Sequence, residues 1–182
     1  MSAIGTTALC LSIGDGVEWP GVTLALGADL NPLTAIRSAI LEMGQTGPHL
    51  RRLLLNKIRP APNDESAVRD MLDHATYFFP VQRQHHFTSL RYGGRRISLR
   101  DLDATETASD LAACRAAIAA AGNEVAVVDV TSSDVRTGPF RVVRAISPDL
   151  QGVSYGFGLD RLAVPRLAGR CVSRPGGVHP IW

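Results

Sequence analysis

The apolar pattern near the start of the chain predicts two short strands. Thr7–Ile13 and Gly21–Leu26 are rich in β-branched and apolar residues, which favour extended structure. Two turn signals lie between them, Gly14-Asp15-Gly16 and Trp19-Pro20-Gly21. We therefore expect a hairpin or a pair of sheet strands over this region.

A helix is predicted directly after these strands. Asn31 is suited to cap exposed helix amides, and Pro32 occupies the position where a missing N–H does no harm. The apolar spacing continues to about Gln45, where Gly47-Pro48 is expected to interrupt or end the helix. Leu50–Lys57 is expected to be helical beyond that break.

A second helix is predicted over Glu65–Tyr77, because Val68, Met71, Leu72 and Ala75 recur at core-facing spacing. Pro80 is expected to stop it. The polar, histidine-containing stretch Gln82–Arg96 follows and predicts a surface excursion.

The last third of the chain predicts a helix packed on a sheet. An alanine-rich helix is expected over Ala108–Ala121, ending at Gly122, with strands over Glu124–Val130 and Phe140–Ile146. Because the predicted strands cluster at both ends of the chain, the pattern favours an α+β fold: a mixed sheet with packed helices. We expect Ala25–Leu30 and Glu124–Val130 to share that sheet.

Composition limits the class of protein. A chain of 182 residues with 45% hydrophobic residues is large enough for one globular unit with its own core. The net charge of +2 gives no electrostatic footprint for nucleic acid, so a small or peptide partner is favoured. No apolar stretch approaches the roughly 18 residues of a membrane span, and a cytoplasmic location is expected. Cys10, Cys114 and Cys171 form no disulfide or zinc pattern.

Four polar residues on the first predicted helix are the main candidates for chemistry. Ser38, Glu42, Gln45 and His49 are four, three and four positions apart and share one face if the helix continues past Gly47. A carboxylate and a carboxamide on such a face are able to bind Mg2+ and a nucleotide, since hard cations prefer oxygen ligands. The alternative is an ordinary solvated helix face.

Other polar motifs carry weaker signals. Tyr155-Gly156-Phe157-Gly158 followed by Arg161 would let backbone approach a phosphate, with the guanidinium as a bidentate partner. An ordinary glycine turn with a surface arginine explains the same residues. His85-His86 predicts surface histidines rather than a metal site, because adjacent side chains diverge in regular structure. Ser12 lacks the G-x-S-x-G setting of a hydrolase nucleophile.

Four segments, taken together and in order, resemble one family. They are ALGADLNPLTAIRSAILEMGQ from Ala25, DHATYFFP from Asp73, NEVAVVDVTSSDV from Asn123, and FRVVRAISPDLQGVSYGFGLDRL from Phe140. The set is similar to YcaO proteins of the thiazole/oxazole peptide maturase type. The resemblance runs from about Gly21 to Pro180, and it places residues 1–182 in the carboxy-terminal portion of a YcaO-like domain.

The resemblance implies a cofactor and site residues. YcaO enzymes use ATP and Mg2+, and their E-x-x-Q pattern falls on Glu42 and Gln45, which implies a magnesium and nucleotide role for Glu42 and a nucleotide role for Gln45. Arg161 matches an arginine near the phosphates, Ser38 departs from the usual residue, and no catalytic residue is assigned. The family's S-x-x-x-E-x-x-E-R motif does not occur in this sequence, and the final five residues, Val178–Trp182, hold one proline where the family has P-x-P-x-P.

The implied reaction is ATP-dependent cyclodehydration of Cys, Ser or Thr in a precursor peptide to azoline heterocycles. Expected partners are that peptide, a leader-peptide-binding protein or a complementary YcaO half, and self-association is an open alternative. The chain is expected to be inactive alone. A non-catalytic scaffold, or a product with little function, are the other interpretations. In the enzyme interpretation, Glu42, Gln45 and Arg161 converge on one cleft facing Tyr155–Gly158, with Trp182 near its rim.

Overall fold

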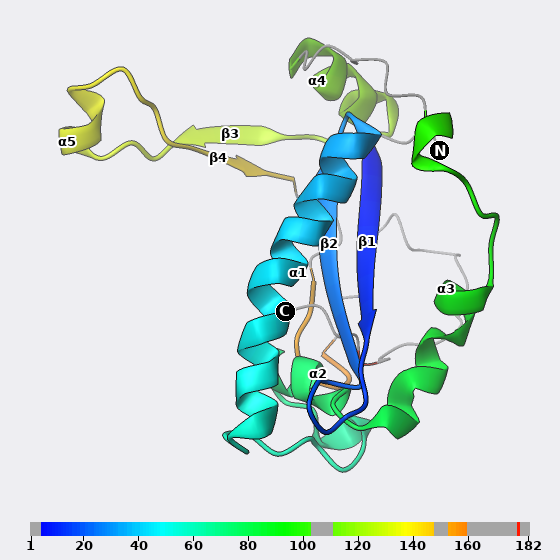
Figure 1. Cartoon of the computed structure of the whole chain (residues 1–182). Helices are drawn as coiled ribbons and strands as arrows, with labels where there is room; N and C mark the ends of the chain where they lie inside the picture. Colours follow the sequence, from blue (N-terminus) through cyan, green and yellow to red (C-terminus); the bar gives the residue numbers. More distant parts are fainter. Residues whose placement is uncertain (1–4, 103–110, 148–152, 160–177, 179–182) are drawn as a thin grey trace. The chain divides into compact units, whose positions relative to one another are not determined.

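The computed structural model of the chain describes residues 5–102, 111–147, 153–159 and 178. It contains two compact units, and each is described by itself. The described part of the larger unit is 5–102 with 153–159 and 178, and that of the smaller unit is 111–147. Figure 1 shows their helices and strands.

The larger unit begins with the expected hairpin. Strands β1 (Thr6–Ile13) and β2 (Val22–Asp29) pair antiparallel over their whole lengths. In the connecting turn, one carboxylate oxygen of Asp15 accepts the backbone N–H groups of Val17, Glu18 and Trp19. The indole N–H of Trp19 donates to the Ser12 hydroxyl at 2.9 Å, which gives Ser12 a structural partner.

Helix α1 (Pro32–Leu55) is capped as predicted, because the Asn31 side chain accepts the N–H groups of Leu33 and Thr34. The expected break at Gly47-Pro48 is wrong, since Pro48 lies inside one continuous helix of 24 residues. Proline removes one helix hydrogen bond and crowds the preceding turn. Here buried residues lie on both sides of it, including Ala39 and Leu50, so tertiary packing holds the helix across the lost bond.

Helix α1 packs closely on β2, and Figure 1 shows the two running side by side. A Cβ atom added at Gly27 would lie 2.1 Å from the carbonyl oxygen of Ala35 and 2.5 Å from the backbone nitrogen of Ala39. Only glycine on the strand and small residues on the helix allow this approach. The sequence signal for the contact is therefore Gly27 together with the alanines of α1.

The second predicted helix is shorter than expected. A 3-10 turn, η1 (Glu65–Ala67), is followed by extended residues, and α2 spans Met71–Tyr77. Asp70 has φ −140° and caps α2 by accepting the N–H of Asp73. The helix therefore begins at Met71 rather than at Glu65, because Asp70 competes for the backbone as a cap.

The polar excursion after Pro80 is made of short helical turns. These are η2 (Val81–Phe87), α3 (Thr88–Tyr92) and η3 (Leu99–Asp101). His85 and His86 are exposed, as predicted, whereas Phe87 is buried in the core. The excursion is therefore anchored by buried Phe87 and by the half-buried side chains of Arg83 and Gln84, which donate to the carbonyls of Pro62 and Gly14.

The core consists of two buried clusters, one between the hairpin and the α2 region and one between α1 and that region. One buried cluster contains Val22, Leu24, Val68, Tyr77, Phe78 and Phe87, and a second contains Leu50, Leu53, Ala75 and Phe79. The backbone N–H groups of Gly21 and Val22 donate to the carbonyls of Phe79 and Phe78. The end of the D-H-A-T-Y-F-F-P segment is thereby attached to the start of β2.

The smaller unit contains α4 (Leu111–Ala120), β3 (Ala126–Asp129), α5 (Ser133–Arg136) and β4 (Val143–Ile146). Strands β3 and β4 pair antiparallel, as Figure 1 shows, and Gly122 follows α4 with φ +76°, a left-handed conformation that favours glycine. The strands fall at their predicted places.

The fold class is α+β, as predicted. Among the described residues the strands form two separate antiparallel pairs, β1-β2 and β3-β4. The expectation that Ala25–Leu30 and Glu124–Val130 share one sheet is therefore wrong. Apolar alternation identifies strands but not their partners. The assignment of residues 1–182 to one YcaO-like domain stays a prediction. Within the described residues, none of the helices combines the length and the apolar character that a membrane crossing requires.

Candidate functional site

The carboxylate of Glu42 is fixed on the edge of the hairpin. One of its oxygens, Oε2, accepts the backbone N–H of Leu26 at 2.8 Å. Leu26 lies opposite Leu9 in the β1-β2 register. The side chain of Glu42, which is half-buried, extends from α1 to the Leu26 N–H. This bond sets the position of the one acidic side chain of α1.

The predicted polar face of α1 extends to His49 because the helix continues through Pro48. Ser38, Glu42, Gln45 and His49 lie on the same side of the helix, and each is about one turn from the next along the chain. Ser38 and Gln45 are exposed, and His49 is half-buried. The face therefore presents one fixed carboxylate beside an accessible carboxamide.

The donor set of this face fits a magnesium–nucleotide unit in part. Mg2+ keeps several waters and is usually held by one or two carboxylates together with substrate phosphates. Glu42 has a second oxygen besides the one bound by Leu26, and ligating carboxylates are commonly held by such a hydrogen bond. In the part of the chain that the structure describes, no three His, Cys, Asp or Glu side chains are grouped to hold a metal by themselves. A metal here would depend on phosphates and further groups.

The glycine turn at Tyr155–Gly158 is attached to α2. The N–H of Gly156 donates to Nε2 of His74 at 2.8 Å, and the N–H of Phe157 donates to the carbonyl of Val68 at 2.8 Å. The ring of Tyr155 meets the ring of His74 edge-on at 5.7 Å. Because Nε2 accepts, a neutral His74 carries its proton on Nδ1.

Gly156 is required at this contact. Its φ of +105° is a conformation that side chains avoid, and an added Cβ would lie 3.0 Å from the Arg69 carbonyl oxygen. Buried His74 therefore meets a backbone segment that only glycine allows to approach.

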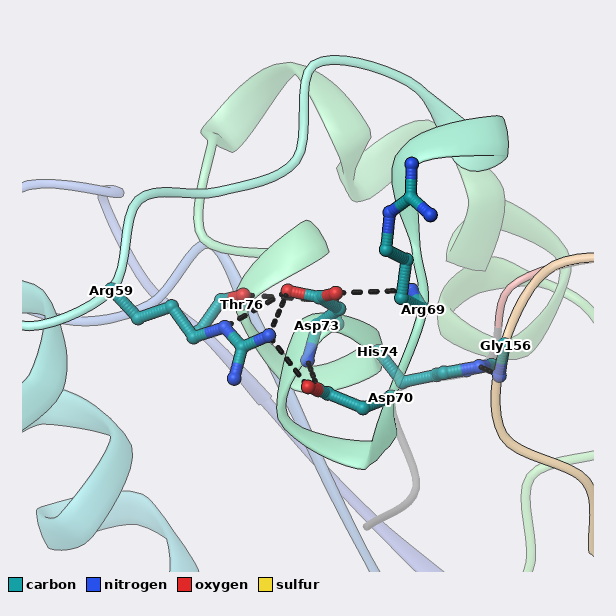
Figure 2. Close-up of polar contacts among 7 residues, drawn as sticks. All are labelled: Arg59, Arg69, Asp70, Asp73, His74, Thr76 and Gly156. Atoms are coloured by element: carbon teal, nitrogen blue, oxygen red, sulfur yellow. Dashed lines mark hydrogen bonds and ion pairs between the residues drawn. The ribbon is translucent and has the colours of Figure 1, made fainter.

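A charged network fixes the start of the same helix (Figure 2). Arg59 donates through Nε to Asp73 at 2.9 Å and through an Nη atom to Asp70 at 2.7 Å. The other oxygen of Asp73 accepts the N–H of Arg69 at 3.0 Å. The backbone N–H of Asp73, and after it the Arg59 side chain, lower the pKa of Asp70 below its ordinary value. The hydrogen bond to Asp70 in turn raises the pKa of Arg59.

This network was not predicted from the sequence. The signal that could have found it is the pair Asp73-His74, two polar residues in a stretch whose neighbours Ala75 and Phe78 are apolar. Both are buried, and each bonds to residues outside α2, Asp73 to Arg59 and His74 to Gly156. A buried polar residue requires a partner, but the sequence does not name it.

The predicted site residues are only partly located. Glu42 contacts β2, whereas the turn at Tyr155–Gly158 contacts Val68 and His74. Arg161 and the Trp182 end lie outside the described residues. The convergence of Glu42, Gln45 and Arg161 on one cleft therefore stays a prediction.

A pocket of about 470 Å³ lies at the C-terminal end of α1. It is lined by Asp15, Gly16, Lys57, Arg59 and apolar residues such as Phe79 and Val81. Neither Glu42 nor Gln45 lines it. The candidate nucleotide face is thus separate from that pocket, with Gln45 exposed and Glu42 half-buried.

Comparison with known proteins identifies the family. The model of the family described as YcaO cyclodehydratase, ATP- and Mg2+-binding, matches residues 4–151, well over half of the chain. Glu42, Gln45, Asp73 and His74 lie inside the matched range, and Arg161 lies beyond it. No curated protein matches the chain, and no solved structure does. The α+β fold agrees with this match over most of the sequence, and the chain belongs to the YcaO family.

Proposed function

We propose that this chain supplies part of the ATP and Mg2+ site of a peptide cyclodehydratase that forms azoline heterocycles from Cys, Ser or Thr. The observation that carries the proposal is the family match over residues 4–151, which includes Glu42 held in place by the Leu26 N–H. The maturase subtype rests on the sequence resemblance alone.

The chemistry assigns roles to the residues of α1. When bound, ATP supplies the phosphoryl group that makes the amide oxygen leave as phosphate, after a Cys, Ser or Thr side chain has attacked the amide carbon. Glu42 would hold the cation through the oxygen that Leu26 does not bind, and the Gln45 carboxamide would donate to or accept from the nucleotide. Arg161 is proposed to contact the phosphates.

The proposed site is completed from outside these 182 residues. The S-x-x-x-E-x-x-E-R motif, which supplies further carboxylates in the family, does not occur in the sequence. Glu42 alone is a weak site, because a doubly charged cation and a triphosphate need several charged partners. We propose a complementary YcaO half as partner, with the precursor peptide and a leader-peptide-binding protein as further partners.

A non-catalytic scaffold that binds a precursor peptide or a partner subunit is the second candidate. The observation that favours it is that Glu42 is already used to bond the β2 backbone. A carboxylate kept only for that bond would serve the fold and not the nucleotide.

The experiment is a phosphate-release assay on the purified chain with ATP and Mg2+, repeated with an added polypeptide that carries the S-x-x-x-E-x-x-E-R motif. We expect no appreciable turnover by the chain alone and turnover in the mixture that Glu42→Ala abolishes. Robust Mg2+-dependent turnover by the chain alone would contradict the incomplete site. Turnover in the mixture that ignores Glu42→Ala would favour the scaffold.

A further inference from the structure

The outer face of α1 is apolar where a surface helix is normally polar. Leu33, Ile40, Leu41 and Leu55 are 41%, 58%, 58% and 46% exposed. Leu33, Ile40 and Leu55 recur at positions that share one side of the helix, and Leu41 adjoins them. This outer face, as we name it, extends over the whole helix, about 36 Å at 1.5 Å per residue.

The middle of the outer face is open at Gly44. A Cβ atom added at Gly44 would meet nothing within 4 Å. Pro48, one turn later and also exposed, has no N–H to donate to the Gly44 carbonyl. The centre of the face therefore lacks a side chain and presents a carbonyl outside the normal helix ladder, which suits the close approach of another helix.

Two arginines lie on the same line of the helix as Gly44. Arg37 and Arg51 are exposed and stand seven positions before and seven positions after Gly44. Arg52 is exposed beside Arg51, and the one acidic residue of α1, Glu42, lies on the flank and bonds to Leu26. The outer face is therefore apolar and positive.

We propose that the outer face of α1 is a docking surface for an amphipathic helix of a partner protein with acidic residues beside its apolar stripe. Arg37 and Arg51 are fourteen positions apart, about 21 Å along the helix. The partner helix is expected to carry Asp or Glu at two points with that separation and apolar side chains between them. Binding through this face goes beyond the proposed nucleotide site and does not require ATP.

Charge decides between this partner and a second copy of the chain. If two copies pack antiparallel about Gly44, Arg37 of each faces Arg51 of the other, and if they pack parallel each arginine faces its own counterpart. Both arrangements oppose like charges, which disfavours association. An acidic helix instead places opposite charges at both points.

The same argument disfavours a membrane surface. Helices that lie in a lipid interface insert an apolar face and keep their basic residues on the polar face. Arg37 and Arg51 instead lie along the centre of the outer face, in line with Leu33, Gly44 and Leu55. Two acidic side chains on a partner protein can pair with Arg37 and Arg51 in that position, whereas the apolar interior of a membrane cannot.

The test uses the whole chain and two synthetic helical peptides. Both peptides carry the same leucine stripe; one has two Glu fourteen positions apart on that stripe and the other has Lys there. Binding is measured by fluorescence anisotropy, with methyl NMR of Leu33, Ile40, Leu41 and Leu55 to locate it. We expect the Glu peptide to bind at least tenfold more tightly than the Lys peptide.

Variants locate the interaction. Arg37→Glu with Arg51→Glu is expected to reverse the preference between the peptides, and Gly44→Trp to weaken the Glu peptide at least tenfold while the chain stays folded. Arg91→Glu with Arg95→Glu, which changes two exposed arginines outside α1, is the charge-matched control and is expected to leave binding unchanged.

Three results would overturn the proposal. They are equal binding of both peptides, self-association through the outer face in sedimentation velocity that Gly44→Trp abolishes, and tighter binding to vesicles of phosphatidylserine and phosphatidylcholine than to the Glu peptide. None of these readouts involves ATP, so failure here leaves the proposed nucleotide site standing, and failure of the ATP assay leaves the docking surface standing.

Discussion

Glu42 on α1 and Leu26 on β2 are joined by a hydrogen bond of 2.8 Å across sixteen positions of sequence, from the Leu26 N–H to Oε2 of Glu42. The carboxylate thus satisfies a strand donor that β1 does not pair, and it couples the helix to the hairpin. Buried backbone donors need such partners. The same bond orients the side chain proposed to hold Mg2+, so Glu42 has a structural role and a proposed ligand role that substitutions can separate.

Glu42→Gln and Glu42→Ala are expected to differ in stability but not in metal affinity. Glutamine keeps an acceptor for the Leu26 N–H and loses the charge, whereas alanine loses both. We expect Glu42→Ala to lower the free energy of unfolding by about 1.5–3 kcal/mol, the range for a hydrogen bond to a charged group, and Glu42→Gln by less. Urea unfolding checks the stability. If both variants lose equal stability, the Leu26 bond does not hold the carboxylate.

The two glycines of α1 are expected to respond oppositely to alanine. Gly44→Ala should stabilise the chain by about 0.5–1 kcal/mol, because the site is open and alanine is the better helix residue. Gly47→Ala should destabilise it, since the new Cβ would lie 2.8 Å from the Trp19 ring. Thermal and urea unfolding of the pair compare the effects. Equal effects would contradict the packing of Trp19 on α1.

His74→Leu is expected to release the glycine turn. Leucine removes the acceptor of the Gly156 N–H and leaves that buried donor unpaired, at a cost of about 1–3 kcal/mol. His74→Gln keeps an acceptor of similar reach and should retain part of the bond. Hydrogen exchange at Gly156 measures the bond directly. Unchanged protection of that amide in His74→Leu would show that the turn is held by other contacts.

Acid is expected to weaken the Arg59 network through Asp70. The folded-state pKa of Asp70 is lowered below 3.8, chiefly by the N–H of Asp73 and then by Arg59. The stabilisation is therefore complete above that ordinary value and is lost as the pH falls through the lowered folded value. Asp70→Asn keeps an acceptor for the cap but not the charge, so its urea midpoint should fall less between about pH 6 and about pH 2.5.

A matched control for this pH dependence is Asp101→Asn, which removes a carboxylate of η3 outside the network. Its acid sensitivity should equal that of the parent chain. The interpretation would be wrong if Asp70→Asn and the parent chain lost the same stability over this pH range.

Local chemistry explains which parts of the fold could be predicted. Asn31 and Pro32 determine the start of α1 through the cap itself, and the turn residues around Asp15 separate β1 from β2. The continuity of α1 through Pro48 could not be predicted, because it depends on burial of residues such as Leu50 against the rest of the unit. Local propensity is overridden by packing in such cases.

The long-range contacts of the site could not be predicted from the sequence either, because they also depend on tertiary packing. The spacing of Glu42 and Gln45 predicted a shared face, which the continuous helix provides. The spacing carried no information on the bond from Leu26 to Glu42 or on the bond from Gly156 to His74. Both join segments distant in sequence, and such pairs follow from tertiary packing and not from periodicity.

Binding of manganese–ATP to the whole chain tests the central claim most directly, because paramagnetic Mn2+ broadens backbone NMR signals near its site even when binding is weak. We expect broadening centred on Glu42 and Gln45 that competes with Mg2+–ATP and is lost in Glu42→Gln, a variant that keeps the Leu26 bond. Broadening centred away from α1, or broadening at α1 that Glu42→Gln leaves unchanged, would contradict the assignment of Glu42 to the metal.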